Sequence, residues 1–251
     1  MPLQTSESCK TFGYEVDICR MFDRIAPRYD LLNHLLSFGQ DFFWRRKAAK
    51  YLNSSGKDKL EILDLATGTG DLLISLFREN PNITKAVGLD ISENMLAICR
   101  EKINSHKLTE HISLVQADAA AIPLPESSFD AVTIAFGIRN TADTFETLKE
   151  MYRILRPGGV SLILEFSLPA NRILRRCYLF YLRGFVALLG RVVSGDDYAY
   201  SYFGKTVENF YKADDFCTLM KEAGFLNVHA NQLTAGVVCI YRGHKAEENT
   251  G

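Results

Sequence analysis

Between Leu60 and Phe166 the sequence alternates short apolar runs with stretches of helical pattern, and this alternation limits the fold more than any other feature. Strands that alternate with helices along a chain form parallel βαβ units. We therefore expect an α/β fold built on a doubly wound, mostly parallel sheet. The expected strands are 60–66, 85–90, 112–116, 129–136 and 160–166, and the expected helices are 71–79, 93–104 and 144–155.

The sequence on either side of this region has a different character. Up to about Leu52 it is helical in pattern and rich in aromatic residues, and the polar stretch "SSGKDK" then interrupts it. The tail adds an expected helix at Ala213–Ala223, a turn at Gly224, and apolar runs near 225–228 and 236–241. We therefore expect a helical segment before the sheet and further cover after its last parallel strand.

The loop after the first expected strand is rich in glycine. Ligands of doubly wound sheets lie beyond the carboxyl ends of the strands. In "DLATGTGDL" (Asp64–Leu72), Gly68 and Gly70 allow a tight turn and a close approach of the backbone to a ligand. The dinucleotide fingerprint has a third glycine three residues later, but here that position is Leu73. A pyrophosphate cofactor, and with it a nicotinamide oxidoreductase, is therefore disfavoured.

Acidic residues follow the next two expected strands. Asp90 comes twenty residues after Gly70, a spacing that suits a carboxylate accepting hydrogen bonds from both hydroxyls of a ribose. Asp118, followed by Ala119, can meet an adenine amino group. Each has a simpler reading: Asp90 as a helix cap, although Ser92 can cap that helix, and Asp118 as a plain loop residue.

The motif "AFGIRN" (Ala135–Asn140) places a charged side chain where a buried strand ends. Arg139 has two readings there. In the first reading it pairs with a local carboxylate such as Asp143 and fixes the loop. In the second reading its charge acts on a bound ligand. The sequence leaves both open.

The glycine loop, Asp90 and Asp118 together resemble the binding set of class I methyltransferases that use S-adenosylmethionine. Further segments are similar to the ubiquinone/menaquinone biosynthesis C-methyltransferase family, over about residues 20–243. These segments are "FDRIAPRYDLLNHLLSFGQDFFWRR" (Phe22–Arg46), "AFGIRN", "RILRPGGVSLILEFS" (Arg153–Ser167) and "LTAGVVCIYRG" (Leu233–Gly243).

This resemblance implies a class I methyltransferase fold and the C-methylation of a prenylated quinol ring. The substrate would be demethylmenaquinol or its ubiquinone-pathway counterpart, with another small molecule as the alternative. The resemblance assigns S-adenosylmethionine to the site. No metal is expected, because the sequence has no metal-ligand spacing and its five histidines form no cluster. The expected cofactor-binding residues are Gly68, Thr69, Gly70, Asp90, Asp118, Ala119 and Ala135, and the expected catalytic residues are Tyr29, Asp30, Arg139 and Asn140.

The same resemblance gives Arg139 a chemical task. A guanidinium is essentially always protonated, so it would favour the ionised quinol oxygen rather than act as a base. Asn140 would orient the same oxygen or a water. We expect Arg139→Ala to fold normally and to lose about 10²–10³-fold in turnover, the scale of one preorganised electrostatic contact.

Three positions depart from the family pattern. Leu32-Asn33 stands where the family usually has Met-Asn, which is a mild change. Asp41 stands where a histidine is usual, so any role of that histidine is in doubt here. Ala135 replaces a serine that contacts the cofactor in many members, which leaves a backbone contact.

Charge and composition exclude some classes of protein. The net charge is -1 with no basic stripe, which argues against nucleic acid and against an RNA methyltransferase. Six scattered cysteines form no CxxC pair and fit a reducing, cytoplasmic setting. The first ten residues contain no apolar signal core. A homo-oligomer remains open.

One segment bears on membranes. Residues 172–193 are rich in large apolar side chains, but five arginines interrupt them, so a spanning helix is not expected. The segment reads either as a helical cover over the core or as an apolar wall that touches substrate or lipid. We expect transient contact with the inner face of a membrane. The expected division of the single domain 1–251 is a helical lid at 1–55, a cofactor-binding core at 56–168, and a substrate-covering insert with C-terminal strands at 169–251.

Overall fold

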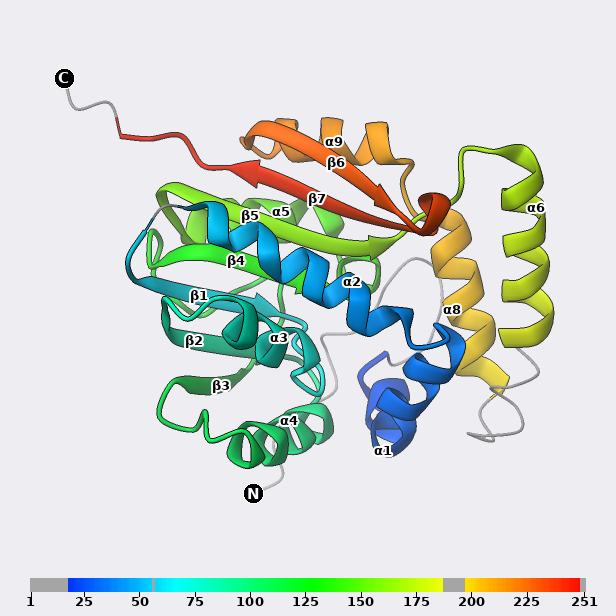
Figure 1. Ribbon diagram of the computed structural model, residues 1–251, viewed down its shortest axis with the longest axis horizontal. Coiled ribbons are helices and arrows are strands. Elements are labelled where there is room, and N and C mark those ends of the chain that lie inside the picture. The colour runs from blue at the N-terminus through cyan, green and yellow to red at the C-terminus, as the bar shows by residue number, and fades with distance from the viewer. Residues whose placement is uncertain (1–17, 56, 187–196, 249–251) are drawn as a thin grey trace.

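The computed structural model describes residues 18–55, 57–186 and 197–248, and their centre is a seven-stranded sheet. The strand order is β3-β2-β1-β4-β5-β7-β6 (Figure 1). The first five strands are parallel, whereas β7 is antiparallel to both β5 and β6. The bounds are β1 Leu60–Leu65, β2 Ile83–Asp90, β3 Ile112–Gln116, β4 Phe129–Ala135, β5 Leu155–Phe166, β6 Leu226–Leu233 and β7 Val238–His244. The expected doubly wound, mostly parallel sheet is confirmed.

Helices cover both faces of this sheet, and alternate strand residues face the two layers. On one face α2 (Gln40–Ala49), α3 (Asp71–Glu79) and α4 (Glu93–Ser105) pack against strand residues such as Ile62. On the other face α5 (Thr144–Ile154) and α9 (Ala213–Glu222) pack against residues such as Leu63. Figure 1 shows α2 and α3 in front of the sheet and α5 and α9 behind it.

A third group of helices lies at the end of the sheet to which the parallel strands point (Figure 1). It consists of α1 (Ile18–Leu36), α6 (Arg172–Phe180), the π-helical turn η3 (Tyr181–Val186) and α8 (Asp197–Asn209). A separate apolar cluster joins them. Met21, Ile25 and Leu32 of α1 pack in it with Leu182 of η3, Val207 of α8 and Met95 of α4. Ligands of such sheets bind at this end, so this helical group covers the place where a site is expected.

Several expected boundaries change in the structure. The helix α5 ends at Ile154, and strand β5 begins at Leu155, so "RPGG" belongs to the strand rather than to a turn before it. The pairing of β4 with β5 shifts register between Phe129 and Ala131, and Gly158 has a positive φ of 71°. The glycines therefore permit an irregular start of β5, and they do not form a separate turn between α5 and β5.

The segment 172–193, with its five arginines, is described up to residue 186, and residues 187–193 lie outside the described residues. Residues 1–17 of the expected lid also lie outside them. The described part forms α6 and η3, and no residue of α6 is buried. Tyr178 of α6 nevertheless packs against the buried cluster of Met21 and Leu182 and lines a cavity, so both expected readings of the segment stay predictions. Across the described parts of the chain, every helix falls short of the length and apolarity needed to cross a bilayer.

Candidate active site

A cavity of about 90 Å³ lies beyond the ends of β1, β2, β3 and β4, and we call it the strand-end cavity. Five of the expected cofactor-binding residues line it. These five residues are Gly68, Asp90, Asp118, Ala119 and Ala135. The strands thus bring residues from four separate stretches of sequence to one place, as the parallel order requires.

Gly68 and Gly70 have different tasks in the first loop. Gly68 has a left-handed φ of 57° and lines the strand-end cavity, and its N–H donates to Asp90 Oδ2 at 2.8 Å. Gly70 lines none of the cavities described below. A Cβ on Gly70 would lie 2.6 Å from Cys99 Sγ, so this glycine is needed for packing between the loop and α4. The geometry therefore supports the expected cofactor contact of Gly68, but it does not support that of Gly70.

Asp90 is 8% exposed and ends β2 with its carboxylate held by backbone amides. Oδ2 accepts from Gly68 N–H, and Oδ1 accepts from Ser92 N–H at 2.9 Å. Ser92 caps α4 itself, because its Oγ accepts from Met95 N–H at 3.2 Å. Burial raises the pKa of Asp90, while the backbone hydrogen bonds oppose this rise. Asp90 is therefore not the helix cap, and its remaining lone pairs are placed at the cavity wall.

Asp118 combines both of its expected readings. Its Oδ1 accepts from Ala120 N–H at 2.9 Å, as a loop aspartate does. The residue also lines the strand-end cavity together with the buried Ala119. The geometry therefore places Asp118 where a ligand from the cavity can reach it.

A smaller cavity of about 30 Å³, the loop cavity, adjoins the first loop and is lined by Thr69, Ala135, Arg45 and Asp64 among others. Asp64 is buried and accepts from the hydroxyls of Thr67 at 2.7 Å and Thr133 at 2.5 Å. Burial raises the pKa of Asp64 to about 7, against the effect of these two hydrogen bonds. Neither Arg45 nor Asp64 is among the residues expected from the sequence.

Asp30, one of the expected catalytic residues, lines neither the strand-end cavity nor the loop cavity. Thr69 donates its hydroxyl to Asp30 Oδ1 at 2.6 Å. Lys102 Nζ lies 2.5 Å from Asp30 Oδ2 and 2.6 Å from Asp71 Oδ1. These contacts join α1 to the first loop, α3 and α4. We therefore infer that Asp30 fastens the helical cover to the sheet, and that its expected catalytic role has no geometric support.

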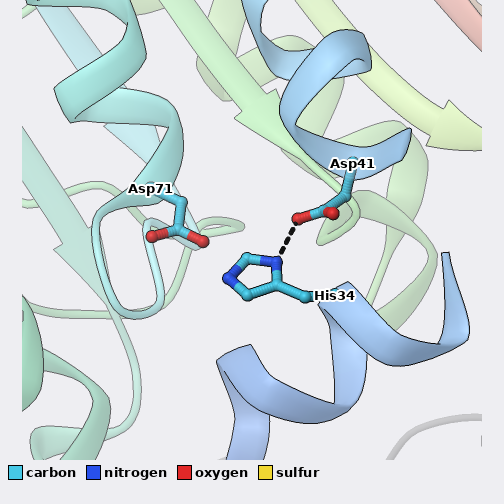
Figure 2. A group of neighbouring side chains, drawn as sticks. All are labelled: His34, Asp41 and Asp71. Atoms are coloured by element: carbon cyan, nitrogen blue, oxygen red, sulfur yellow. Dashed lines mark hydrogen bonds and ion pairs between the residues drawn. The ribbon is translucent and has the colours of Figure 1, made fainter. Parts of the chain in front are cut away.

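Asp41 belongs to a second polar group, shown in Figure 2 with His34 and Asp71. Its Oδ2 accepts from Arg45 Nη1 and from His34 Nδ1, the latter at 2.7 Å, and Ser37 donates to Oδ1 at 2.8 Å. Burial disfavours the charged carboxylate, but Arg45, Ser37 and His34 outweigh it and lower the pKa of Asp41.

His34, Asp41 and Asp71 offer ligand atoms within 4.8 Å of one another, a spacing that a metal site also has. However, Arg45 Nη2 lies 3.8 Å from Asp71 Oδ2, and Lys102 pairs with the same carboxylate. Both acids therefore have protein cations as partners. We interpret the group as an ion-pair network between α1, α2 and α3.

A larger cavity of about 240 Å³, the apolar cavity, lies between α1, α2, α6, η3, α8 and the motif after β4. Its aromatic lining includes Trp44, Phe136, Phe166, Tyr178, Tyr181 and Phe203. Tyr29, Phe136 and Asn140 line both this cavity and the strand-end cavity. The two cavities therefore adjoin at these residues, one with polar strand ends and one with an aromatic wall.

Arg139 stands in the wall of the apolar cavity with a buried partner. Its Nη1 donates to Glu165 Oε1 at 2.6 Å and to the Phe136 carbonyl at 2.7 Å. The guanidinium carbon lies 5.3 Å and 5.2 Å from the ring centres of Phe166 and Phe203. Burial raises the pKa of Glu165, although the Arg139 charge opposes this.

The expected partner Asp143 is wrong. Asp143 caps α5, where its Oδ1 accepts from the N–H groups of Phe145 at 2.8 Å and Glu146 at 3.1 Å. Glu165 takes its place, and a signal for it exists in the sequence: it is a lone carboxylate inside the apolar run "SLILEFS". An isolated charge in a buried strand requires a partner.

Two polar atoms at this place have no hydrogen-bond partner among the described residues. They are Arg139 Nε, a donor, and Asn140 Oδ1, an acceptor, and both are buried. Buried polar atoms are nearly always paired, with protein or with water or ligand. Because both residues line the apolar cavity, these atoms are placed to meet a polar group inside it.

Tyr29 lies where the cavities adjoin, since it lines all three of them. Burial raises its pKa, with the charge of Arg139 and a hydrogen bond with Asn33 acting in the opposite direction. Tyr29 therefore stays a neutral hydroxyl at ordinary pH, able to donate one hydrogen bond and to accept another. Its expected place at the site fits this geometry.

Solved structures share this architecture. The fold matches that of a SAM-dependent methyltransferase from Thermotoga maritima with a TM-score of 0.64 and 21% identity, covering 91% of this chain and 99% of that one. It also matches phosphoethanolamine N-methyltransferase 2 from Haemonchus contortus, solved with S-adenosyl-L-methionine, with a TM-score of 0.60, 16% identity and coverage of 80% and 52%. The chain therefore has the class I methyltransferase fold.

Two relatives are much closer in sequence. A ubiquinone/menaquinone biosynthesis C-methyltransferase from Geobacter sulfurreducens is 43% identical, covering 90% of this chain and 87% of the relative. A demethylmenaquinone methyltransferase from Thermus thermophilus is 44% identical, covering 90% and 100%. The model of the ubiE/COQ5 methyltransferase family matches residues 10–245. Nearly the whole length, including the residues of all three cavities and the motif around Arg139, falls within this match, so the chain belongs to the ubiE/COQ5 methyltransferase family.

Proposed function

We propose that this protein transfers a methyl group from S-adenosylmethionine to a ring carbon of a prenylated quinol, with demethylmenaquinol as the substrate. The observation that carries the proposal is the shared wall of the two cavities. A polar cavity at the strand ends adjoins an aromatic cavity at Tyr29, Phe136 and Asn140. Relatives named as quinone-pathway C-methyltransferases support the choice of substrate.

The strand-end cavity suits an adenosine compound without phosphate. Asp90 offers carboxylate oxygens for ribose hydroxyls, and Asp118 and Ala119 lie where an adenine would sit. Gly68 leaves its side of the cavity free of a side chain, and Asp64 and Arg45 beside the loop cavity suit the ammonium and carboxylate of a methionine end. When bound, S-adenosylmethionine supplies an electrophilic methyl group.

The apolar cavity suits a quinol ring and the start of its tail. Apolar side chains, many of them aromatic, make up most of its wall, and prenyl and ring carbons are stabilised there by removal from water. Two of its polar lining residues, Arg139 and Asn140, come from the motif after β4, and Asn140 also lines the strand-end cavity. This arrangement orients the hydroxyl of the quinol toward the same side as the methyl donor.

The protein's chemical task is to favour the ionised hydroxyl beside the accepting carbon. Arg139 remains charged, and its unpaired Nε can donate to the developing oxyanion. Asn140 Oδ1 can accept from the hydroxyl or from a water that carries the proton away. Trp44, Phe136 and Phe166 exclude bulk water, which strengthens these polar contacts.

The test is an assay of purified protein with S-adenosylmethionine and two quinols, demethylmenaquinol and the demethylated ubiquinone precursor. We expect a ring-methylated product from demethylmenaquinol, identified by mass spectrometry. Asp90→Asn is the control for dependence on the strand-end cavity. Transfer to neither quinol, by protein that binds S-adenosylmethionine, would refute the substrate assignment and leave the fold and family unaffected.

A further inference from the structure

Helix α6 (Arg172–Phe180) presents apolar side chains to solvent. Ile173 is 75% exposed and Phe180 is 81% exposed, and Cys177 between them is also exposed. These positions are spaced i, i+4 and i+7, so they lie on one face of the helix. A helix of a soluble domain normally turns such a face to the core, but no residue of α6 is buried. We call Ile173, Cys177 and Phe180 the α6 stripe.

The α6 stripe continues toward the apolar cavity. Phe180 precedes Tyr181, whose hydroxyl donates to the Leu36 carbonyl at 2.5 Å and whose ring centre lies 6.1 Å from that of Phe38. Phe38 is 75% exposed and also lines the apolar cavity, as Tyr181 does. The apolar cavity therefore reaches the surface at Phe38, beside the stripe. Figure 1 shows α6 as the outermost helix at this end of the molecule.

Positive charge borders the same stripe. Arg172 and Arg176 are exposed, lie one turn apart on α6, and form no ion pair with a residue in the described ranges. Segment 172–186 contains no acidic residue. An apolar face bordered by arginines matches a bilayer with anionic headgroups, where the rings enter the interface and the guanidinium groups meet phosphate.

We propose that the α6 stripe, with Arg172 and Arg176, docks on an anionic lipid bilayer so that the apolar cavity opens toward the membrane at Phe38. This inference rests on the proposed function, because a prenylated quinol is stored in a bilayer. Docking lets the ring enter the cavity while the tail remains in lipid. The tail then never crosses water, which explains why a helix of a water-exposed domain keeps apolar residues outside.

Vesicle flotation with the full chain tests the docking. Vesicles of phosphatidylcholine with 30% phosphatidylglycerol, chosen as a probe of about one-third anionic lipid, are compared with phosphatidylcholine alone. We expect binding to the anionic vesicles and at least tenfold weaker binding to the neutral ones, since each cation near such a surface contributes about 1 kcal/mol. The variant pair Ile173→Glu/Phe180→Glu and the pair Arg172→Glu/Arg176→Glu should each lose at least about tenfold in binding.

Leu226→Glu is the matched control, because Leu226 is 51% exposed at the start of β6. Leu226 pairs with His244, which pairs with Val160, whereas α6 follows the opposite end of β5. The control variant should bind vesicles like the unchanged protein. Unchanged binding of both α6 pairs, or no binding of the original protein, would overturn the docking face. Equal binding to neutral and anionic vesicles would overturn the anionic partner. Binding of a protein to α6, without binding of lipid, would also overturn the proposal that α6 docks on a bilayer.

A second measurement separates this inference from the proposed function. A water-soluble quinol with a truncated tail should be methylated equally by the original protein and by the Ile173→Glu/Phe180→Glu pair, since neither residue lines a cavity. Quinol embedded in vesicles should be methylated at least tenfold more slowly by the pair. Equal rates of the original protein and the pair on embedded quinol would contradict docking. If the original protein methylated none of these quinols, the proposed function would be contradicted.

Discussion

Replacement of Arg139 should affect both folding and turnover, because the residue has a buried partner and a cavity-facing atom. The Arg139 side chain is 7% exposed and that of Glu165 is 0% exposed. Arg139→Ala leaves Glu165 buried without its cation. Loss of one partner of a buried ion pair costs about 3–5 kcal/mol of unfolding free energy. Arg139→Ala is therefore expected to be destabilised rather than to fold normally.

The size of this loss can be set against the stability of a domain. Globular domains unfold with about 5–15 kcal/mol, so a loss of 3–5 kcal/mol removes a large part of it. For a chain of this length, each kcal/mol lowers the melting temperature by about 2–4 °C. We expect the melting temperature of Arg139→Ala to fall by about 6–20 °C. Low activity of this single variant would then not distinguish partial unfolding from the loss of a catalytic contact.

The double variant Arg139→Gln/Glu165→Gln separates the two effects. It removes both charges together, so no buried charge is left unpaired, and two amides can still hydrogen-bond. We expect its melting temperature to return to within a few degrees of the original. Its kcat should remain about 10²–10³-fold low, because the charge that favours the quinolate is absent. Its affinity for S-adenosylmethionine should change by less than about threefold, since Arg139 does not line the strand-end cavity.

The assay combines differential scanning calorimetry with steady-state kinetics on demethylmenaquinol. Glu165→Gln alone is the control, because it keeps the Arg139 charge and should keep kcat within about tenfold even if its stability falls. Recovery of kcat by the double variant would show that Arg139 serves to neutralise Glu165. The catalytic interpretation of Arg139 would then be wrong.

Three further outcomes are expected. Asp90→Asn should weaken S-adenosylmethionine binding by about 1–3 kcal/mol in calorimetry, and unchanged affinity would contradict the ribose assignment. The pKa of about 7 for Asp64 means that its carboxylate gains charge as pH rises through 7, so affinity for the cationic cofactor should rise between pH 6 and 8 and Asp64→Asn should abolish this step. Lys102→Met leaves Asp30 and Asp71 without their shared cation, so hydrogen exchange in α1 should accelerate, and an unchanged rate would remove the fastening role of Asp30.

The sheet was predictable because its signal is local. The parallel strands β1 and β4 are buried apolar runs, and α4 has a recognisable N-cap in Ser92. Strand β6 gives no such signal, since most of its residues are exposed and no periodic pattern results. It is held instead by pairing with β7, a contact between distant segments that periodicity does not report.

The strand-end residues were predictable for a topological reason. Parallel order alone brings Gly68, Asp90, Asp118 and Ala135 to one end of the sheet, whatever the exact register. The partner of Arg139 depends on register, because β4 and β5 place Ala135 opposite Leu164 and thereby bring the next residue, Glu165, to the arginine. Without that register, a nearby carboxylate such as Asp143 is the natural but wrong choice.

Asp41 shows why a departure from a family pattern has to be interpreted in three dimensions. Taken along the sequence, an aspartate in place of the usual histidine removes an imidazole from this position. In the fold, His34 of α1 lies against Asp41 of α2, with Nδ1 and Oδ2 2.7 Å apart (Figure 2). The carboxylate also pairs with Arg45, which lines the apolar cavity and the loop cavity. A histidine at position 41 would face Arg45 and His34 and leave Asp71 as the neighbouring anion, with Asp71 Oδ2 3.8 Å from Arg45 Nη2. The aspartate therefore suits this pair of neighbours, because its charge gives Arg45 a direct partner between the cavities and His34 an acceptor.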